Sequence, residues 1–304
     1  MGKMPKLITK ATAVYGMGDA LNGRAFLMTY CKQKNISPET ITLYTEKYWW
    51  MFEGLGFKRD LNKNNFLGLW AYRNFGRYDL PRFFVPDKLD QCIAMNAQIK
   101  YNFDVCVPLP RYTPPKIKLP RKFITFNTGY GEFSGKPEEK DIVCIKSWPN
   151  EYWEEFVKKI GVPCVQIGKG ASCSIIPGTA LNLVDQLSIK ESAEVMRKGL
   201  FHIDMEGGLS ILNQHLGKKS VVLFGPTAIE NQGRSFNLNI SSGVCMPCYE
   251  WGSKMYHKLY EDKNKLSCRV ECMSAIKPDF VIEKIKERGW HKKAAYIEGF
   301  EKGE

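Results

Sequence analysis

The sequence predicts an α/β protein made of two doubly wound domains. Short apolar, β-prone runs alternate with segments of helical periodicity along most of the chain. In each half, a predicted strand runs into a glycine turn and then a helix, which is typical of a parallel sheet. A segment with five prolines, 107–120, separates the halves. We therefore expect domains at 1–110 and 121–288, a stiff linker at 111–120, and a tail at 289–304 that could cross back to the first domain.

The first domain is expected to begin with a βαβ unit. Strands are predicted at 11–15 and 40–44, with a helix that begins near Asp19 between them and an aromatic helix at 46–55 after them. Asp19 then falls at the carboxyl edge of a parallel sheet, which is where such sheets bind their ligands. The alternative is that Asp19 is only a helix N-cap.

The second domain alternates strands and helices in the same way. Its strands are expected at 122–126, 142–145 and 163–168, and its helices after Pro149, at 190–198 and at 279–288.

The segment 199–227 carries the strongest signal of the second domain. It reads as a strand ending at Met205, a turn, a helix to about Leu216 and a second apolar strand at 220–224. The turn consists of Glu206, Gly207 and Gly208, and the second strand is closed by Gly225, Pro226 and Thr227. Glycines in front of a helix let backbone amides approach a phosphate, and the helix N-terminus adds about half a positive charge. The alternative is an ordinary βα turn.

The charge is unevenly distributed over the 304 residues. The net charge is +12, and the first 120 residues hold 18 Lys and Arg against 9 Asp and Glu. An anionic partner, or a basic surface kept for solubility, would explain this excess. The sequence has neither a membrane-spanning apolar run nor a signal-peptide pattern, so we expect a cytoplasmic protein.

Four late cysteines have the spacing of a metal site. Cys245 and Cys248 form a CxxC pair, and Cys268 and Cys272 form a CxxxC pair. Four thiolates suit a tetrahedral zinc or iron site, whereas the alternative is four unligated thiols. A site filled by four protein ligands has no open position for substrate, so its role would be structural.

Several motifs together resemble a known family. They are the GMGDAL turn at 16–21, a KSWP segment that begins at Lys146, a VQIG strand, and the long motif at 207–227. In this order they resemble glycosyltransferase family 9, the heptosyltransferases that use ADP-heptose. The resemblance implies the GT-B fold, two Rossmann-like domains facing a central cleft. The late cysteines are similar to those of the autotransporter heptosyltransferases, which glycosylate protein and carry iron.

The resemblance also implies roles for single residues. Asp19 matches the general base that deprotonates the acceptor hydroxyl, with inversion at the anomeric carbon. Lys146 matches the cation that pairs with the diphosphate leaving group, so that no catalytic divalent metal is expected. Gly207 and Gly208 match the diphosphate turn, and Glu206 matches the acid that binds sugar hydroxyls. The remaining donor-binding residues are Gly225, Pro226 and Thr227, and the cleft residues are Gly16, Met17 and Gly18.

This chain departs from the better-known family members at two places. They read DTG, with a histidine three residues further on, where this chain has Glu206, Gly207, Gly208 and Ile211. They also have paired threonines before the family lysine, a role for which Thr128 and Gly129 are the candidates here. These departures leave the sugar and the nucleotide open.

The resemblance predicts transfer of a sugar, heptose from ADP-heptose first among them, to a hydroxyl of a bacterial surface glycan such as the lipopolysaccharide core, or of a protein. Peripheral association with the inner face of the cytoplasmic membrane is compatible with this activity. The alternatives are a GT-B relative that does not catalyse transfer, and a metal-thiolate protein that binds nucleic acid. The basic excess lies far in sequence from the cysteines, so we expect no nucleic-acid partner.

Overall fold

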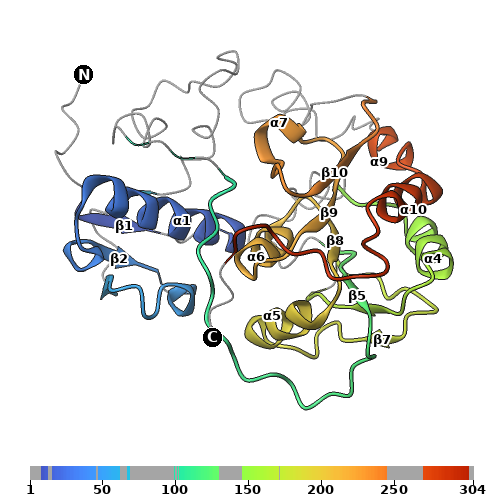
Figure 1. Ribbon diagram of the computed structural model, residues 1–304, viewed down its shortest axis with the longest axis horizontal. Helices are drawn as coiled ribbons and strands as arrows, with labels where there is room; N and C mark the ends of the chain where they lie inside the picture. Colours follow the sequence, from blue (N-terminus) through green and yellow to red (C-terminus); the bar gives the residue numbers. More distant parts are fainter. Residues whose placement is uncertain are drawn as a thin grey trace, which may run out of the picture. The chain divides into compact units, whose positions relative to one another are not determined.

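The chain is arranged in two compact units, Met1–Leu109 and Pro110–Glu304 (Figure 1). The computed structural model describes residues 8–12, 16–45, 47–61, 67–68, 99, 101, 103–129, 146–170, 172–244 and 270–300. The strand expected at 142–145 therefore lies outside the described residues. No described helix is both long enough and apolar enough to cross a membrane.

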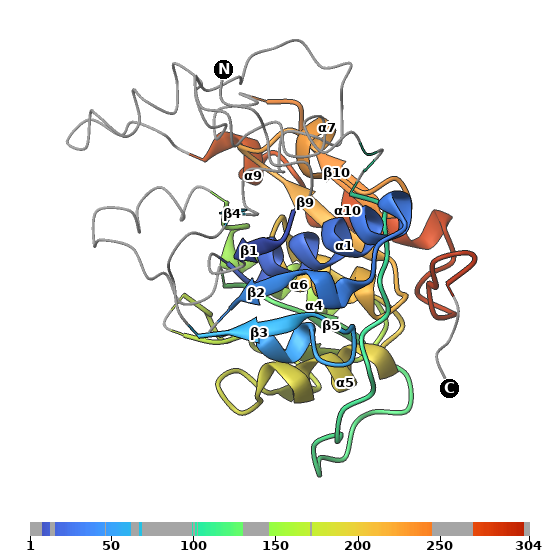
Figure 2. The same cartoon turned by 90° about the vertical axis from the view of Figure 1, so that its left-hand side faces the viewer.

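The first unit contains a parallel sheet of short strands. Its order is β3-β2-β1-β4, and Figure 2 shows β1, β2 and β3 side by side. The strands are β1 (Lys10–Thr12), β2 (Thr42–Tyr44), β3 (Lys58–Asp60) and β4 (Leu67–Gly68). Ala11 of β1 is paired with Leu43 of β2 on one side and with Leu67 of β4 on the other. This confirms the βαβ unit predicted from the sequence.

Helix α1 (Met17–Lys34) connects β1 to β2 and has a well-defined start and end. Gly16 is its N-cap, and the Gly16 N–H donates to Oδ2 of Asp19 at 3.2 Å. Asp19 is thus the third residue of the helix and not its N-cap. The helix ends at Asn35, which has the left-handed conformation common at helix C-termini.

A buried arginine anchors the end of the first unit. Arg24 of α1 is fully enclosed and donates hydrogen bonds to three backbone carbonyls. Its acceptors are Met51 O at 2.5 Å, Val107 O at 2.5 Å and Pro108 O at 2.7 Å. Because a buried guanidinium needs such acceptors, these bonds fix the chain at 107–108 against α1.

The second unit contains a six-stranded parallel sheet of order β10-β9-β8-β5-β6-β7. Its strands are β5 (Ile124–Phe126), β6 (Cys164–Gln166), β7 (Leu181–Asn182), β8 (His202–Met205), β9 (Ser220–Phe224) and β10 (Leu238–Ser241). Numbered within the unit, the strands run 3-2-1-4-5-6, which is the Rossmann order. The direction of winding reverses between β5 and β8, so the ligand edge is expected where these two strands end.

Helices cover both faces of this sheet. They are α4 (Asn150–Lys159), α5 (Ile189–Lys198), α6 (Gly208–His215), α7 (Ile229–Gln232), α9 (Glu271–Ser274) and α10 (Pro278–Glu287). Helices α4 and α10 pack together, and α5 packs with α6 (Figure 1). The buried face of α4 is aromatic, with Trp153 5.3 Å from Phe126 of β5 and 4.8 Å from Trp148, between ring centroids. The strands and helices predicted for described parts of this half are thus confirmed, with ends shifted by a few residues.

The aromatic helix expected at 46–55 is wrong. The described part of this segment forms only a short 3-10 helix, η2 (Trp49–Met51), and a second, η1 (Pro38–Thr40), precedes β2. Gly54 and Gly56 have φ angles of 77° and 87°, in the left-handed region. A right-handed helix cannot continue through such residues, so the aromatic segment turns back after one short turn.

The described part of the tail, 289–300, lies against the amino ends of β8 and β9. The Ala295 N–H donates to Leu200 O at 2.9 Å, and the Lys219 N–H donates to Ala295 O at 2.8 Å. Ile297 N–H donates to Gly217 O at 3.0 Å. A return of the tail to the first domain stays a prediction.

Candidate active site

The candidate site of the second unit lies where the winding of the sheet reverses. Strand β5 is followed by Asn127, Thr128 and Gly129, and β8 is followed by Glu206 and Gly207. The carboxyl ends of the two paired strands therefore carry two of the turns that the sequence singled out.

Lys146 and Glu206 form an ion pair at this edge. The lysine Nζ lies 2.5 Å from Oε2 of Glu206, and both side chains are largely buried, with exposures of 18% and 16%. The Thr227 hydroxyl donates to the same oxygen at 3.3 Å. Three residues predicted to bind the donor are thus brought together, from the segment before α4, the end of β8 and the turn after β9.

The helix that follows Glu206 begins at the pair. Gly207 is the N-cap of α6, with a φ of −176°, and Gly208 is its first residue. Ser210 donates from its hydroxyl to Gly207 O at 2.7 Å. A β-carbon on Gly207 would meet only Met205 O, at 3.7 Å. Neither the backbone conformation nor packing requires glycine at 207, where glycine is a favoured N-cap residue and its lack of a β-carbon leaves space beside the backbone for a ligand.

The turn after β5 is held by a buried polar network. Asn127 accepts from the Gly129 N–H at 3.1 Å, and its amide group donates to Gly129 O and, at 3.1 Å, to Oδ1 of Asp204. His202 lies 3.5 Å from the other oxygen of Asp204 and 3.0 Å from the Thr125 hydroxyl. Burial raises the pKa of Asp204, although the hydrogen bonds from His202 and Asn127 oppose this shift.

Thr128 is fixed by a second buried amide. Its hydroxyl donates to Ser174 O at 2.9 Å and accepts from Nε2 of Gln166 at 3.2 Å. Gln166 also donates to Ser174 O and accepts from the Ile176 N–H. The Thr128 hydroxyl and the Gly129 N–H therefore make hydrogen bonds that stabilise the turn itself. The ion-pair partner of Lys146 is Glu206, which does not belong to this turn.

The turn after β9 packs against helix α9. A β-carbon on Gly225 would lie 2.7 Å from Cγ of Met273 and 3.4 Å from Sγ of Cys272. Pro226 and Thr227 are buried. Glycine is therefore required at 225 by packing against α9, whatever else the turn binds.

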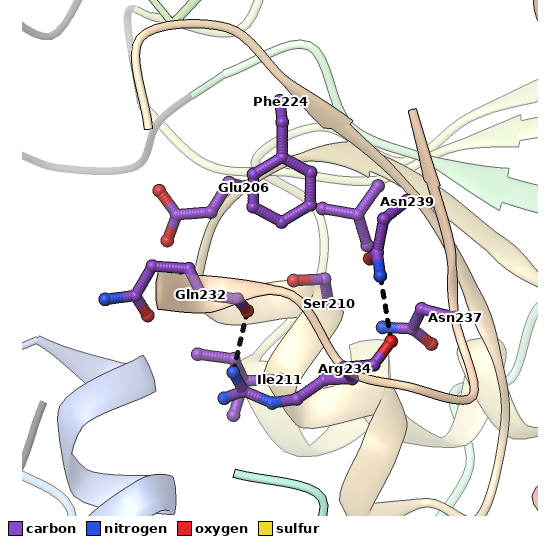
Figure 3. Close-up of a pocket in the computed structure, with 9 residues that line it drawn as sticks. Glu206, Ser210, Ile211, Phe224, Gln232, Arg234, Asn237 and Asn239 are labelled. Carbon is purple, nitrogen blue, oxygen red and sulfur yellow. Dashed lines mark hydrogen bonds between the residues drawn. The ribbon is translucent and has the colours of Figure 1, made fainter. Parts of the chain in front are cut away.

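A small polar pocket lies beside Glu206 (Figure 3). It is lined by Glu206, Ser210, Ile211, Val222, Phe224, Gln232, Arg234, Asn237 and Asn239. Arg234 donates to Gln232 O at 2.7 Å and to Oε1 of Gln214 at 2.9 Å, and Asn239 donates to Arg234 O at 2.9 Å. In Figure 3 the Glu206 carboxylate is directed away from Asn237 and Asn239. Ile211 contributes an apolar side chain to the lining of this pocket.

The candidate base lies in the first unit. Asp19 is 8% exposed and its carboxylate accepts a hydrogen bond from the Gly16 N–H. The carboxylate is thereby held against the turn formed by Gly16, Met17 and Gly18. Tyr48 is close enough for Asp19 to add to the rise in the tyrosine's pKa, which is caused first by burial.

Of the four late cysteines, only Cys272 is described. Its side chain is buried, and its carbonyl accepts from the Ser242 hydroxyl at 2.8 Å. A buried thiol is a donor of the kind that zinc and iron accept. Cys245, Cys248 and Cys268 lie outside the described residues. Among the residues that are described, no group of three or more His, Cys, Asp or Glu side chains could hold a metal ion.

The sequence analysis missed Asn127, Gln166 and Asp204 as residues that build the site. Each is a polar residue in or directly after a fully buried strand, and each is almost fully buried itself. A polar residue within or next to a short β-prone run was the available signal, since a buried polar group needs a specific partner.

No protein-family model matches this chain, and no curated protein sequence matches it. Solved structures do match its fold. One is the iron-containing dodecameric glycosyltransferase TibC from enterotoxigenic Escherichia coli, with a TM-score of 0.60 and 13% identity over 93% of this chain and 78% of that chain. TibC in complex with ADP-D-beta-D-heptose gives a TM-score of 0.59 at 13% identity, over 94% and 78%.

A glycosyl transferase family 9 structure from Veillonella parvula matches with a TM-score of 0.56 and 14% identity, over 94% of this chain and 99% of that chain. The likeness confirms the fold that the motifs predicted. The chain is an α/β protein with two parallel sheets and has the GT-B fold of these glycosyltransferases.

Proposed function

We propose that this protein is an inverting glycosyltransferase that moves a sugar from a nucleoside-diphosphate donor to a hydroxyl group. The observation that carries the proposal is the group Lys146, Glu206 and Thr227 beside the N-terminus of α6, where the winding of the second sheet reverses. In Rossmann-type sheets this is the edge at which nucleotides bind.

The second unit would bind the donor. The amides at Gly207 and Gly208 and the dipole of α6 favour a diphosphate, and the Lys146 ammonium adds a full positive charge. As the glycosidic bond breaks, negative charge grows on the leaving diphosphate. A fixed ammonium stabilises that charge more than it stabilises the ground state, which is how such a group accelerates transfer without a catalytic divalent metal.

Asp19 of the first unit would be the base. A carboxylate is ionised at neutral pH and can accept the proton of the acceptor hydroxyl as that oxygen attacks the anomeric carbon. The bond to the sugar then forms on the face opposite the departing diphosphate, which inverts the configuration. The hydrogen bond from Gly16 holds the carboxylate in one orientation for this task.

ADP-heptose is the donor we propose first. The motifs resemble family 9, and the matching TibC structure contains ADP-D-beta-D-heptose. Ile211 and Glu206, which differ from the better-known family members, leave room for another sugar. The acceptor would be a bacterial surface glycan such as the lipopolysaccharide core, or a protein, modified on the cytoplasmic side of the membrane.

The four late cysteines would hold a structural zinc or iron. TibC is an iron-containing protein, and Cys272 supplies a buried thiol directly behind Gly225. A metal there would stiffen the segment behind the donor turn, outside the chemical step. Elemental analysis of the purified protein, compared with a variant carrying Cys245→Ser and Cys248→Ser, tests for it.

The decisive experiment is a donor screen. The purified protein is incubated with ADP-heptose and with a panel of other nucleotide sugars, together with acceptors from cell extract, and products are identified by mass spectrometry. Transfer by the wild type, and its loss in Lys146→Ala, is the expected result. Binding of a nucleotide sugar without transfer to any acceptor would favour the non-catalytic relative. Absence of both binding and transfer would contradict the proposal.

A further inference from the structure

The carboxylate of Glu206 is already paired with the ammonium group of Lys146, on which the proposed donor site depends. Its Oε2 atom accepts from Lys146 at 2.5 Å and from Thr227 at 3.3 Å. Two donors from separate elements thus converge on one oxygen of the residue that directly precedes the N-cap of α6. An internal anion is therefore bound by the same ammonium that we propose for the diphosphate.

Two anions cannot both hold this ammonium at full strength. Lys146 can donate up to three hydrogen bonds but carries a single charge. At exposures of 18% and 16% the pair is shielded from water on most sides, so a second negative group beside Glu206 is repelled more strongly than in bulk solvent. A diphosphate must either displace the carboxylate or accept this repulsion.

We propose that Glu206 competes with the diphosphate for Lys146 and so weakens the binding of the nucleoside diphosphate product. This inference rests on the proposed function. The free diphosphate left after transfer carries one more negative charge than the sugar-linked donor, because the bond to the sugar has been replaced by an ionised oxygen. Repulsion from Glu206 therefore acts more strongly on the product than on the donor, and favours its release.

The length of the side chain is part of the inference. Aspartate at this position would be shorter by one carbon–carbon bond, about 1.5 Å. An aspartate on the same backbone would therefore hold its carboxylate farther from Lys146 Nζ, by up to this length, and so weaken the pair. Glu206→Asp and Glu206→Gln both weaken the pair, one through distance and the other through charge.

The test is the affinity for ADP and for inorganic pyrophosphate, measured by isothermal titration calorimetry without any acceptor. Glu206→Gln should bind both probes about five- to tenfold more tightly than the wild type, and Glu206→Asp about two- to threefold more tightly. Glu155→Gln is the matched control, since Glu155 forms an exposed pair with Lys159 elsewhere on the unit. It makes the same change in net charge and should leave both affinities unchanged.

A second arm shows whether Glu206 acts through the lysine. In a Lys146→Gln background only the direct repulsion by Glu206 remains, so Glu206→Gln should tighten ADP binding by a smaller factor than it does in the wild type. An equal factor in both backgrounds would refute competition for the lysine. Damage to the fold cannot imitate the expected result, because a disrupted site does not bind more tightly.

The outcomes separate the inference from the function on which it rests. If the wild type binds ADP or pyrophosphate but Glu206→Gln binds no more tightly, the competition is refuted and Glu206 is left as a ligand for sugar hydroxyls. If neither the wild type nor any variant binds ADP, pyrophosphate or a nucleotide sugar, the proposed function fails, and the inference fails with it.

Discussion

Gly225 lies directly against the side chain of Met273, so that a β-carbon at 225 would lie 2.7 Å from its Cγ atom. This contact joins the turn after β9, which carries Thr227, to helix α9, which carries Cys272. The turn that carries Thr227 and the helix that carries the last of the four late cysteines are thus in direct contact at Gly225.

Gly225→Ala should destabilise the protein by about 1–3 kcal/mol, because the methyl group has to displace a buried side chain in a packed interior. Urea unfolding followed by circular dichroism measures this. The double variant Gly225→Ala, Met273→Ala removes the atoms that the methyl meets. Its free energy of unfolding should exceed that expected from adding the two single effects, and simple additivity would show that the contact does not cause the loss.

Gly207→Ala should behave in the opposite way. Its extended backbone suits any residue, and a β-carbon there meets only Met205 O at 3.7 Å, so the free energy of unfolding should change by no more than about 1 kcal/mol. The methyl would nevertheless stand at the amino end of α6, where we propose that the diphosphate binds. We expect ADP affinity, measured by calorimetry, to fall at least tenfold. Unchanged affinity would place the diphosphate elsewhere.

Asp19 has a structural and a proposed catalytic role, which two substitutions separate. Asp19→Asn keeps an oxygen that can accept the Gly16 N–H but removes the base, whereas Asp19→Ala removes both. The alanine variant should lose about 1 kcal/mol of stability and the asparagine variant less. Both should lose at least a hundredfold in kcat with ADP binding unchanged. An asparagine variant that retains full transfer activity would exclude Asp19 as the base.

The sequence predicted the layout of this fold because its signals are local. Apolar runs such as 220–224 and the turn at 206–208 specify strand, turn and helix from neighbouring residues alone. The family resemblance, and not local periodicity, brought Lys146, Glu206 and Thr227 into one list of donor residues, and the structure places the lysine and the threonine in contact with the glutamate.

What the sequence did not predict depends on strand order. Asn127 and Asp204 are far apart in the chain, and they meet because β5 is paired with β8. No periodicity reports that pairing, so a buried aspartate in an apolar strand could be noticed but not matched to its partner. The error at 46–55 has a similar origin, since apolar spacing favoured a helix that the backbone at Gly54 and Gly56 prevents.

Lys218 is a buried charge on the edge of the second sheet opposite the candidate site. It is 1% exposed, and its Nζ donates to Arg197 O at 3.0 Å and to Gly199 O, at the C-terminal end of α5. The same group lies 5.0 Å from the ring centre of Tyr296 in the tail. Burial lowers the pKa of Lys218 from 10.5 to about 8.

This shift predicts a stability that rises with pH. Below pH 8 the lysine is protonated in both the folded and unfolded chains, and folding bears the whole cost of burying the charge. Between pH 8 and 10.5 the unfolded chain binds the proton and the folded chain does not, so the free energy of unfolding increases with pH. Compared with Lys218→Met, which does not titrate, the wild type should gain about 2.5 kcal/mol between pH 7 and pH 10.

Urea unfolding of both proteins at pH 7, 8, 9 and 10 measures the difference, in which the titration of all other groups cancels. A difference that stays constant with pH would show that the carbonyls of Arg197 and Gly199, together with the ring of Tyr296, keep the ammonium charged in the folded protein. In that case Lys218 would hold the end of α5 as a cation throughout this pH range, and its methionine variant should be the less stable protein at every pH tested.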